Sequence, residues 1–192
     1  MCALLVGLLD VRVVGVGEWP SWLMIRVETT LERPSCPGCD RRPHDHGCRE
    51  VELVDLPVFG RAARLVWNKQ RWLCPNPACP MVTWTEQHPA IASECCALTT
   101  RAARWATIQV GRHGRAVSEV AADLGCDWHT VMDAVALFGQ PLIDDPGRFG
   151  AVTAVGLDET LAIREGPYRR QLFSTQIVDV QCGQLLDVLA GI

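Results

Sequence analysis

Two pairs of cysteines constrain the fold of this chain more than any other feature of its sequence. Cys36 and Cys39 are separated by Pro-Gly, and Cys74 and Cys79 are separated by Pro-Asn-Pro-Ala. Proline and glycine favour tight turns, so each pair can direct two thiolates at one point, and the two pairs can complete a tetrahedral zinc shell. The alternatives are two disulfides or buried free thiols. Nothing in the composition indicates an oxidising compartment, which favours structural zinc held in a zinc ribbon.

The length and composition indicate a cytoplasmic protein. The chain has 192 residues, of which 48% are hydrophobic, enough for one or two small domains with buried cores. Its apolar amino-terminal run follows no basic segment and is interrupted by Asp10 and Arg12, far short of a membrane span. We therefore expect no membrane contact and reduced cysteines outside the zinc site.

Five further residues qualify this interpretation of the cysteines. His44, His46 and Cys48 lie close behind the first pair and are alternative zinc ligands, although an exposed loop is the favoured interpretation. Cys126 and Cys182 have apolar neighbours in the sequence and are expected to be core residues.

The charge of the chain is unevenly distributed around a formal net value of −4. Residues 36–88 carry a net charge of +1, and residues 141–192 carry −3. Seventeen of the eighteen basic residues are arginine, which suits bidentate contacts to phosphate and guanine, although a GC-rich genome produces the same bias. The middle of the chain is predicted to face double-stranded DNA. Four arginines without acidic neighbours are the candidate phosphate contacts: Arg101, Arg104, Arg112 and Arg115.

Residues 1–93 are predicted to form a β-rich zinc-ribbon domain. Alternating and β-branched segments predict strands over residues 11–16, 23–29, 51–56 and 63–67. Trp67, Trp72 and Trp84 cover the small core in the favoured interpretation. The alternative is a platform on which nucleic-acid bases stack.

Residues 94–140 follow a helical period and predict a helix-turn-helix DNA-binding domain. Helices are expected over residues 101–110, 117–124 and 128–138. Thr99 or Thr100 caps the first helix, Gly125 forms the turn after the second, and Asp127 caps the third. An ordinary three-helix packing unit is the alternative. The exposed early residues of the third helix are the candidate base contacts: Trp128, His129, Thr130 and Asp133.

After a linker at residues 140–150, residues 151–192 predict three antiparallel strands joined by short turns. The first strand is apolar and is expected to be buried and to end at Asp158 and Glu159. A carboxylate at the end of a strand can hold a hard cation such as magnesium. By itself this signal is weak, because many strands end in acidic residues that are simply solvated.

Over essentially its whole length the chain resembles the DDE transposases of bacterial insertion sequences, specifically the ISL-three family. The motifs are "LLVGLLDVRVVGVGE", "RPSCPGCDRR", "VDLPVFGRAARLVWNKQRWLCPNPACPMVTWTEQHP", the helix-turn-helix, and "AVGLDETLAIREGPYRRQLFSTQIVDVQCGQLLDVLAG". The resemblance implies a multi-module α+β protein: a β-rich zinc ribbon, a helix-turn-helix bundle, and the first three antiparallel strands of a truncated RNase H-like domain.

The same resemblance assigns roles to individual residues. It makes Asp158 the first of three carboxylates that hold two magnesium ions for phosphoryl transfer, with Glu159 and Asp179 near the site. The other two carboxylates are expected beyond Ile192. We therefore expect a natural truncation or a fragment that is inactive alone, with residues 150–192 poorly stabilised. It also assigns the structural zinc ligands: Cys36, Cys39, Cys74 and Cys79.

Three functions are compatible with the sequence. The first is the amino-terminal portion of a transposase that binds terminal inverted-repeat DNA. The complete protein would act as a homo-oligomer that cleaves and joins DNA strands. The second is a stand-alone zinc-dependent DNA-binding regulator or repressor of transposition. The third is a zinc-ribbon adaptor for another protein, which predicts no salt-sensitive affinity for DNA.

Overall fold

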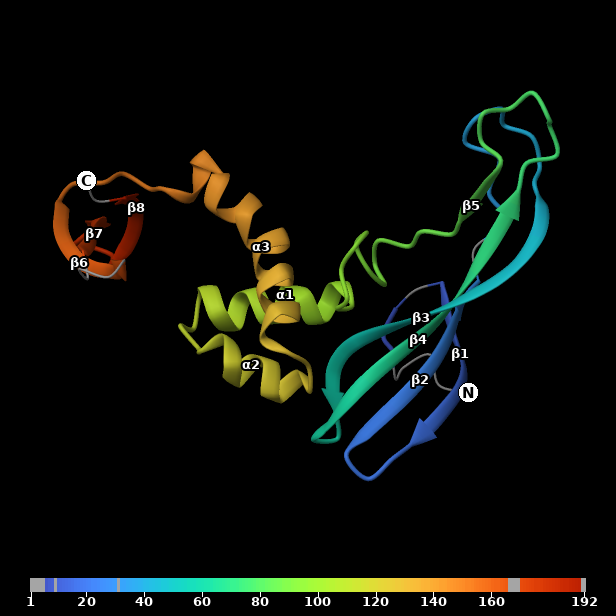
Figure 1. Cartoon of the computed structure of the whole chain (residues 1–192), viewed down its shortest axis with the longest axis horizontal. Helices are drawn as coiled ribbons and strands as arrows, with labels where there is room; N and C mark the ends of the chain where they lie inside the picture. The colour runs from blue at the N-terminus through green and yellow to red at the C-terminus, as the bar shows by residue number, and fades with distance from the viewer. Residues whose placement is uncertain (1–5, 9, 31, 166–169, 191–192) are drawn as a thin grey trace. The chain divides into compact units, whose positions relative to one another are not determined.

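The computed structural model describes residues 6–8, 10–30, 32–165 and 170–190 of the chain (Figure 1). The chain divides into two compact units, Met1–Pro141 and Leu142–Ile192. The division between residues 1–93 and 94–140 stays a prediction, since both segments belong to the first unit. Among the described residues, no helix is long and apolar enough to span a membrane.

One mixed sheet organises the first unit. Its main strands follow the order β1-β2-β4-β3, with β5 paired to β4, and β2 and β4 are its parallel neighbours. The strands are β1 (Val11–Glu18), β2 (Trp22–Thr29), β3 (His44–Val58), β4 (Arg61–Leu73) and β5 (Thr83–Thr85).

Strands β3 and β4 are longer than predicted because they pair along nearly their whole length. Their register extends from Val58 opposite Arg61 to His44 opposite Leu73. The prediction that His44, His46 and Cys48 lie in a loop is therefore wrong, although all three residues are exposed as expected.

Successive side chains of β3 point to opposite faces of the sheet and pack in two different hydrophobic clusters. Leu53 packs with Trp67 in the cluster of the sheet, whereas Val54 and Leu56 pack against the helices. Trp67 is 1% exposed and Trp72 is 8% exposed, so the core interpretation of these two tryptophans is confirmed. Trp84 is partly buried and packs beside the paired cysteines.

Three helices follow the sheet, as predicted: α1 (Thr100–Gly111), α2 (Val117–Leu124) and α3 (Trp128–Asp144). Thr99 caps α1 by accepting a hydrogen bond from the Ala102 N–H at 3.3 Å. Asp127 accepts the Thr130 N–H at 2.8 Å and so caps α3. The alanines that the helices share at their interface allow close approach, and Cys126 is partly buried there.

Helix α3 is longer than predicted and includes part of the predicted linker. The helix continues past residue 138 and contains Pro141, and the 3₁₀ turn η2 (Pro146–Arg148) follows it. A single proline removes one helical hydrogen bond, and the helix-forming Leu142 and Ile143 continue beyond it. The connection between α3 and β6 therefore covers residues 145–154, later in the chain than the predicted linker at residues 140–150.

The sheet and the helices of the first unit share backbone hydrogen bonds. The Val54 N–H donates to the Ala97 carbonyl at 2.9 Å, and the Thr99 N–H donates to the Val54 carbonyl at 2.9 Å. This short pairing with β3 leads directly into the N-terminus of α1. The position of α1 is therefore fixed by an edge strand of the sheet.

The second unit is an antiparallel meander, as predicted, with strands in the order β6-β7-β8. The strands are β6 (Val155–Glu165), β7 (Arg170–Asp179) and β8 (Gln184–Ala190). The predicted bounds of the first strand are wrong, because β6 begins at Val155 and continues through Asp158 and Glu159. Pairing with β7 carries the strand on, and the backbone partner of Asp158 is Gln176. The predicted turn between the first two strands falls at residues 166–169, which lie outside the described residues.

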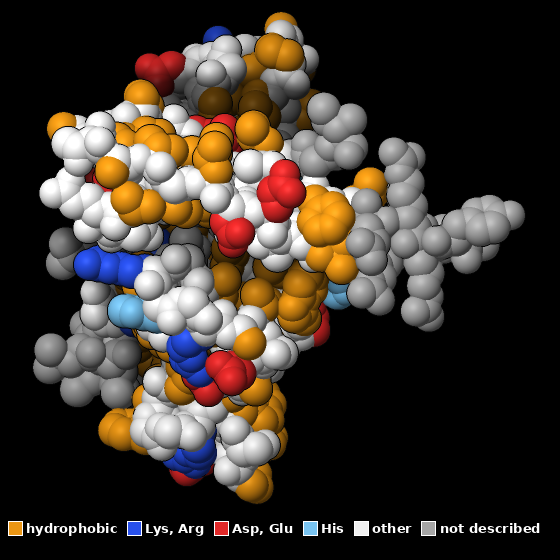
Figure 2. Space-filling view, turned by 90° about the vertical axis from the view of Figure 1, so that its left-hand side faces the viewer, with side chains coloured by type: hydrophobic (Ala, Val, Ile, Leu, Met, Phe, Trp, Pro, Cys, Tyr) orange, Lys and Arg blue, Asp and Glu red, His pale blue; other side chains and the backbone are white. Residues whose placement is uncertain are grey.

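The second unit exposes much of its apolar surface. Val155 is 57% exposed and Leu157 is 70% exposed, so the expectation that this strand is buried is wrong. Hydrophobic side chains lie at the surface in the space-filling view (Figure 2). Cys182 is also exposed, contrary to its predicted place in a core, because it follows the end of β7 in a turn. Cys2 lies outside the described residues.

Candidate metal centre and nucleic-acid interface

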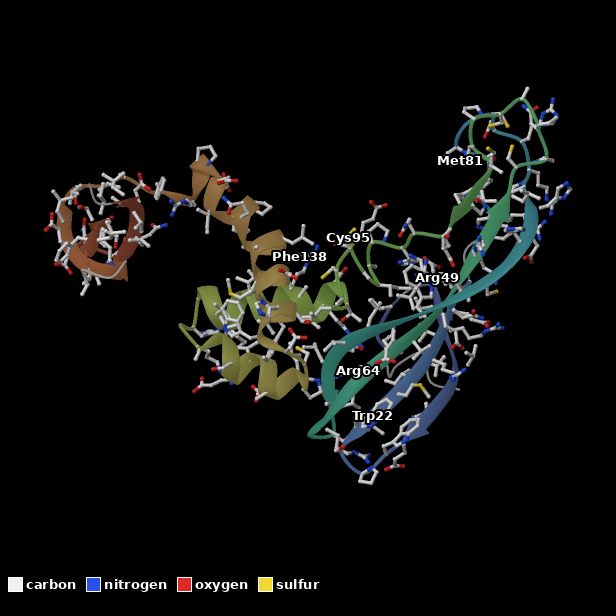
Figure 3. The ribbon with its side chains drawn as sticks, in the orientation of Figure 1. Trp22, Arg49, Arg64, Met81, Cys95 and Phe138 are labelled. Atoms are coloured by element: carbon white, nitrogen blue, oxygen red, sulfur yellow. The ribbon has the colours of Figure 1, made fainter. Side chains whose placement is uncertain are left out.

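The four paired cysteines converge at one end of the first unit. Their Sγ atoms lie within 4.8 Å of one another. Cys36 Sγ is 3.8 Å from Cys79 Sγ, and Cys39 Sγ is 3.5 Å from Cys74 Sγ. The cluster includes Met81 among its packed neighbours, beside the sulfur atoms visible at this end of the unit (Figure 3).

Local backbone structure aims these thiols. In the first turn the Asp40 N–H donates to the Cys36 carbonyl at 2.8 Å, and in the second the Cys79 N–H donates to the Asn76 carbonyl at 3.0 Å. Gly38 lies between the first two cysteines, and a Cβ at this position would lie 2.8 Å from Cys79 Sγ. Any larger residue there would press on the sulfur cluster. The Pro-Gly spacer is therefore required by close packing as well as by the turn.

The cluster fits a zinc ion. With Zn–S bonds of about 2.3 Å, a tetrahedron places its sulfurs about 3.8 Å apart, close to the separations observed here. Four protein thiolates close the coordination shell, leaving no position for water or substrate. Bound zinc would therefore hold the two turns together and would not take part in catalysis.

The pKa values of the thiols differ with their surroundings. A hydrogen bond from the backbone N–H of Arg41 lowers the pKa of Cys39 to about 7. Burial raises the pKa of Cys74 to about 12 and also raises the pKa of Cys79. Because zinc binds thiolates, metal binding at neutral pH must displace protons from Cys74 and Cys79.

The cysteine cluster is the one group of three or more potential metal-ligating side chains within the described parts of the chain. His44, His46 and Cys48 do not form such a group with one another or with the zinc cluster. A role for them as replacement ligands gains no support from this geometry.

Arg101, a predicted phosphate contact, is held inside the first unit. Its Nε donates to Asp55 Oδ1 at 2.8 Å, and its Nη2 donates to Asp55 Oδ2. Asp55 is fully buried and also accepts the Thr99 hydroxyl at 2.7 Å. Hydrogen bonding to Asp55 raises the pKa of Arg101. This bidentate pair joins β3 to α1, and it makes Arg101 a poor candidate for a DNA contact.

The other three predicted arginines differ in their surroundings. Arg115 donates to Asp123 at 2.8 Å and lies 4.0 Å from Glu119, so it is engaged with α2. Arg104 and Arg112 are exposed on α1 and at its end. No ion pair involves either of these two among the residues that the structure describes. They are therefore the available phosphate contacts of the helical segment.

The candidate base contacts lie in the first two turns of α3. Trp128, His129 and Asp133 are exposed, and the ring of Trp128 meets that of His129 edge-on at 5.2 Å. The Thr130 hydroxyl is occupied, since it donates to Asp127 at 3.1 Å. The structure places these four residues on the first two turns of α3, and base contact stays a prediction for each.

Further basic residues escaped the sequence analysis. Arg41 and Arg42 are exposed directly after the first cysteine turn and Arg49 is exposed on β3, and within the described residues no ion pair engages them. The only signal in the sequence was the Arg41-Arg42 dipeptide directly after the first cysteine pair. Their availability became visible only once the ion pairs of the other arginines were known.

Among its described residues, the second unit has no group of three or more potential metal ligands. Asp179 on β7 lies opposite Val155 on β6, so the side chains of these two residues share one face of the sheet. Asp158 is three residues after Val155, and because side chains alternate along a strand, Asp158 lies on the opposite face. Glu159, the neighbour of Asp158 in the same strand, also points away from it. Asp179 accepts the Gln181 N–H at 2.9 Å, which lowers its pKa. The expectation that Glu159 and Asp179 lie beside Asp158 at one site is therefore not met within this sheet.

Comparison with known families agrees with the metal centre. Residues 32–79 match the family model of the zinc-finger of transposase IS204/IS1001/IS1096/IS1165, and this range contains all four clustered cysteines. No curated protein and no solved structure matches the chain. The chain thus carries a zinc ribbon of the transposase type, and the family match covers neither the three helices nor the meander.

Proposed function

We propose that the first unit is the DNA-binding part of a transposase and recognises terminal inverted repeats. The observation that carries the proposal is the tetrahedral cysteine cluster within a segment that matches a transposase zinc finger. In this proposal the α2–α3 pair is a helix-turn-helix, and the exposed first turn of α3 reads base edges. The ribbon extends the contact along the DNA.

The available arginines support contact with the phosphate backbone. Five exposed arginines of the first unit have neither an ion-pair partner nor a cation–π contact among the described residues: Arg41, Arg42, Arg49, Arg104 and Arg112. If all of them neutralise phosphates, the logarithm of affinity falls with the logarithm of salt with a slope of about −4.5. Raising salt from about 50 to about 200 mM would then weaken binding by roughly 500-fold.

Catalysis is proposed only for an assembly with further carboxylates. Asp158 is exposed in the middle of β6, where it can supply one oxygen ligand to magnesium. A two-metal site needs several such ligands, and in the described part of the chain Asp158 belongs to no group of three or more potential metal ligands. Phosphoryl transfer thus depends on residues from elsewhere in a complete protein.

Binding to duplex DNA tests the proposal. The zinc-loaded chain is used to select from a randomised duplex pool, and affinity for the selected and a scrambled duplex is then measured by fluorescence anisotropy across a salt series. We expect a preference for the selected duplex and a steep salt dependence. Arg104→Ala should reduce the slope by about 1. Arg12→Ala is the matched control, because Arg12 is already paired with Glu28. Equal, salt-insensitive affinity for both duplexes would refute the proposal.

A further inference from the structure

The tip of the β3–β4 hairpin has an unusual turn. Val58 pairs with Arg61, which leaves Phe59 and Gly60 as a two-residue loop with φ values of +52° and +74°. Positive φ at both central residues is the pattern of a type I′ turn, in which Asn-Gly is the preferred pair. A phenylalanine occupies the position where asparagine would be favoured.

Phe59 is unfavourable at this place in two respects. A bulky side chain at positive φ strains the backbone, and the residue is 82% exposed, more than any other large hydrophobic residue described. Neither contact with the core nor turn geometry explains its presence. Backbone strain combined with an exposed aromatic ring is the kind of feature that binding partners account for.

The hairpin is anchored to the turn of the α2–α3 pair. Gly125 has a φ of +64°, and a Cβ on it would lie 2.8 Å from the Cβ of Ala62 on β4. Arg64 reaches from β4 to the C-terminus of α2, where it donates to the Leu124 carbonyl at 3.3 Å and to the Gly125 carbonyl (Figure 3). The tip of the hairpin is thereby held beside the start of α3.

The lengths of chain on either side of the contact between Ala62 and Gly125 allow Phe59 and Trp128 to reach neighbouring grooves of one duplex. Phe59 is three residues from Ala62 along a strand, a span of about 10 Å. Trp128 is three residues from Gly125, at most about 10 Å of chain. Half a helical turn of DNA is about 17 Å. A duplex that receives the first turn of α3 in its major groove can therefore present its adjacent minor groove to the hairpin tip.

The charges around this anchor do not oppose DNA. Glu18 pairs with Arg61 at 2.6 Å, Glu52 with Arg64 at 3.5 Å, and Asp123 with Arg115 at 2.8 Å. Asp127 is engaged by the first turn of α3, where its charge also complements the helix N-terminus. Each carboxylate next to the hairpin therefore has a cationic or hydrogen-bonding partner.

We propose that the β3–β4 hairpin is a second DNA contact beside α3, with the ring of Phe59 inserted into the minor groove as an apolar wedge. Phenylalanine inserted between base steps is a known means by which proteins hold the minor groove. The inference rests on the proposed function, since it places the hairpin on the same duplex as α3. It adds a contact that the helices alone do not supply.

Phe59→Asn separates this role from folding. Asparagine tolerates positive φ, so the variant should raise the urea midpoint of the first unit while weakening affinity for the selected duplex by about 10-fold. Phe59→Trp keeps an aromatic wedge and should retain affinity. If wild type binds and Phe59→Asn binds equally well, the hairpin role is refuted and the proposed function stands. If wild type binds no duplex, both proposals fall.

Photocrosslinking identifies the contact directly. Benzoylphenylalanine is placed at position 59 of the zinc-loaded chain, and the same probe at Val14, which is 42% exposed on β1, is the control. We expect crosslinks to the selected duplex from position 59 and none from position 14. Crosslinks from position 59 only to a second copy of the chain would overturn the DNA role and assign the hairpin to a protein interface.

Discussion

Replacing Arg101 by methionine is expected to lower the free energy of unfolding of the first unit by about 3 kcal/mol. The substitution keeps the aliphatic stem and removes the guanidinium that binds Asp55 at two oxygens. Asp55 is fully buried, so its carboxylate would keep only the Thr99 hydroxyl as a described side-chain donor.

The magnitude follows from the burial of the two partners. Breaking a buried ion pair by removing one partner costs about 3–5 kcal/mol, chiefly because the remaining charge is left uncompensated. The side chain of Arg101 is 28% exposed, whereas that of Asp55 is 0% exposed. Water that already reaches the guanidinium weakens the pair, which places the expected loss at the lower end of this range.

Urea unfolding of the zinc-loaded chain, followed by tryptophan fluorescence, measures the loss. Arg104→Met is the matched control, because Arg104 lies one turn further along α1 and is exposed, and it should change stability by less than about 0.5 kcal/mol. The double variant Asp55→Leu/Arg101→Met removes both charges and should recover much of the stability. A loss below about 1 kcal/mol for Arg101→Met, or additive effects in the double variant, would show that the pair of Arg101 and Asp55 does not stabilise the first unit.

Three further predictions concern the metal centre and the helix turn. Removal of zinc by a chelator, or the substitution Cys74→Ser, should unfold the two cysteine turns, because structural zinc contributes roughly 10–16 kcal/mol of apparent binding free energy. The fluorescence emission of Trp84 should then shift to the red. Cys48→Ser, which lies outside the cluster, should leave this emission unchanged. Zinc affinity should fall with falling pH by at least about 100-fold per unit just above pH 7, since the raised pKa values of Cys74 and Cys79 keep both thiols protonated, and more steeply below about pH 7, where Cys39 also takes up a proton. A competition titration with a zinc chelator at several pH values measures this slope, and a flat profile would contradict it. Gly125→Ala should destabilise the first unit by about 2–4 kcal/mol in urea, from positive φ and from the clash with Ala62. Gly114→Ala, also at positive φ but in open space, should cost only about 1 kcal/mol, and equal losses would show that the clash is unimportant.

The features that local sequence determines were predicted well. The spacing of the four cysteines within turn-forming residues identified the cluster, because a turn of a few residues fixes where its thiols point. The three helices begin close to their predicted positions, and α1 and α2 also end close to them, since Thr99, Gly125 and Asp127 are caps and turns that act on adjacent residues. The end of α3 was missed because residues 140–150 were predicted to form a linker.

Strand bounds depended on partners that the local sequence does not reveal. The extension of β3 to His44 follows from pairing with β4, and the continuation of β6 through Asp158 follows from pairing with β7. An acidic residue within a half-exposed strand and an acidic residue at the end of a strand are preceded by similar sequences. Only the pairing of β6 with β7 shows that Asp158 lies within its strand.

Local sequence predicted the two cysteine pairs and the three helices, because each of these features arises from residues within a few positions of one another. Which arginines remain available to a ligand was settled only by tertiary packing. Arg101 and Arg104 lie one turn apart on α1 and are equivalent in sequence, yet only Arg101 meets the buried carboxylate of Asp55. That carboxylate comes from a strand 46 residues earlier, and a contact of such separation exists only once the sheet and the helix have packed together.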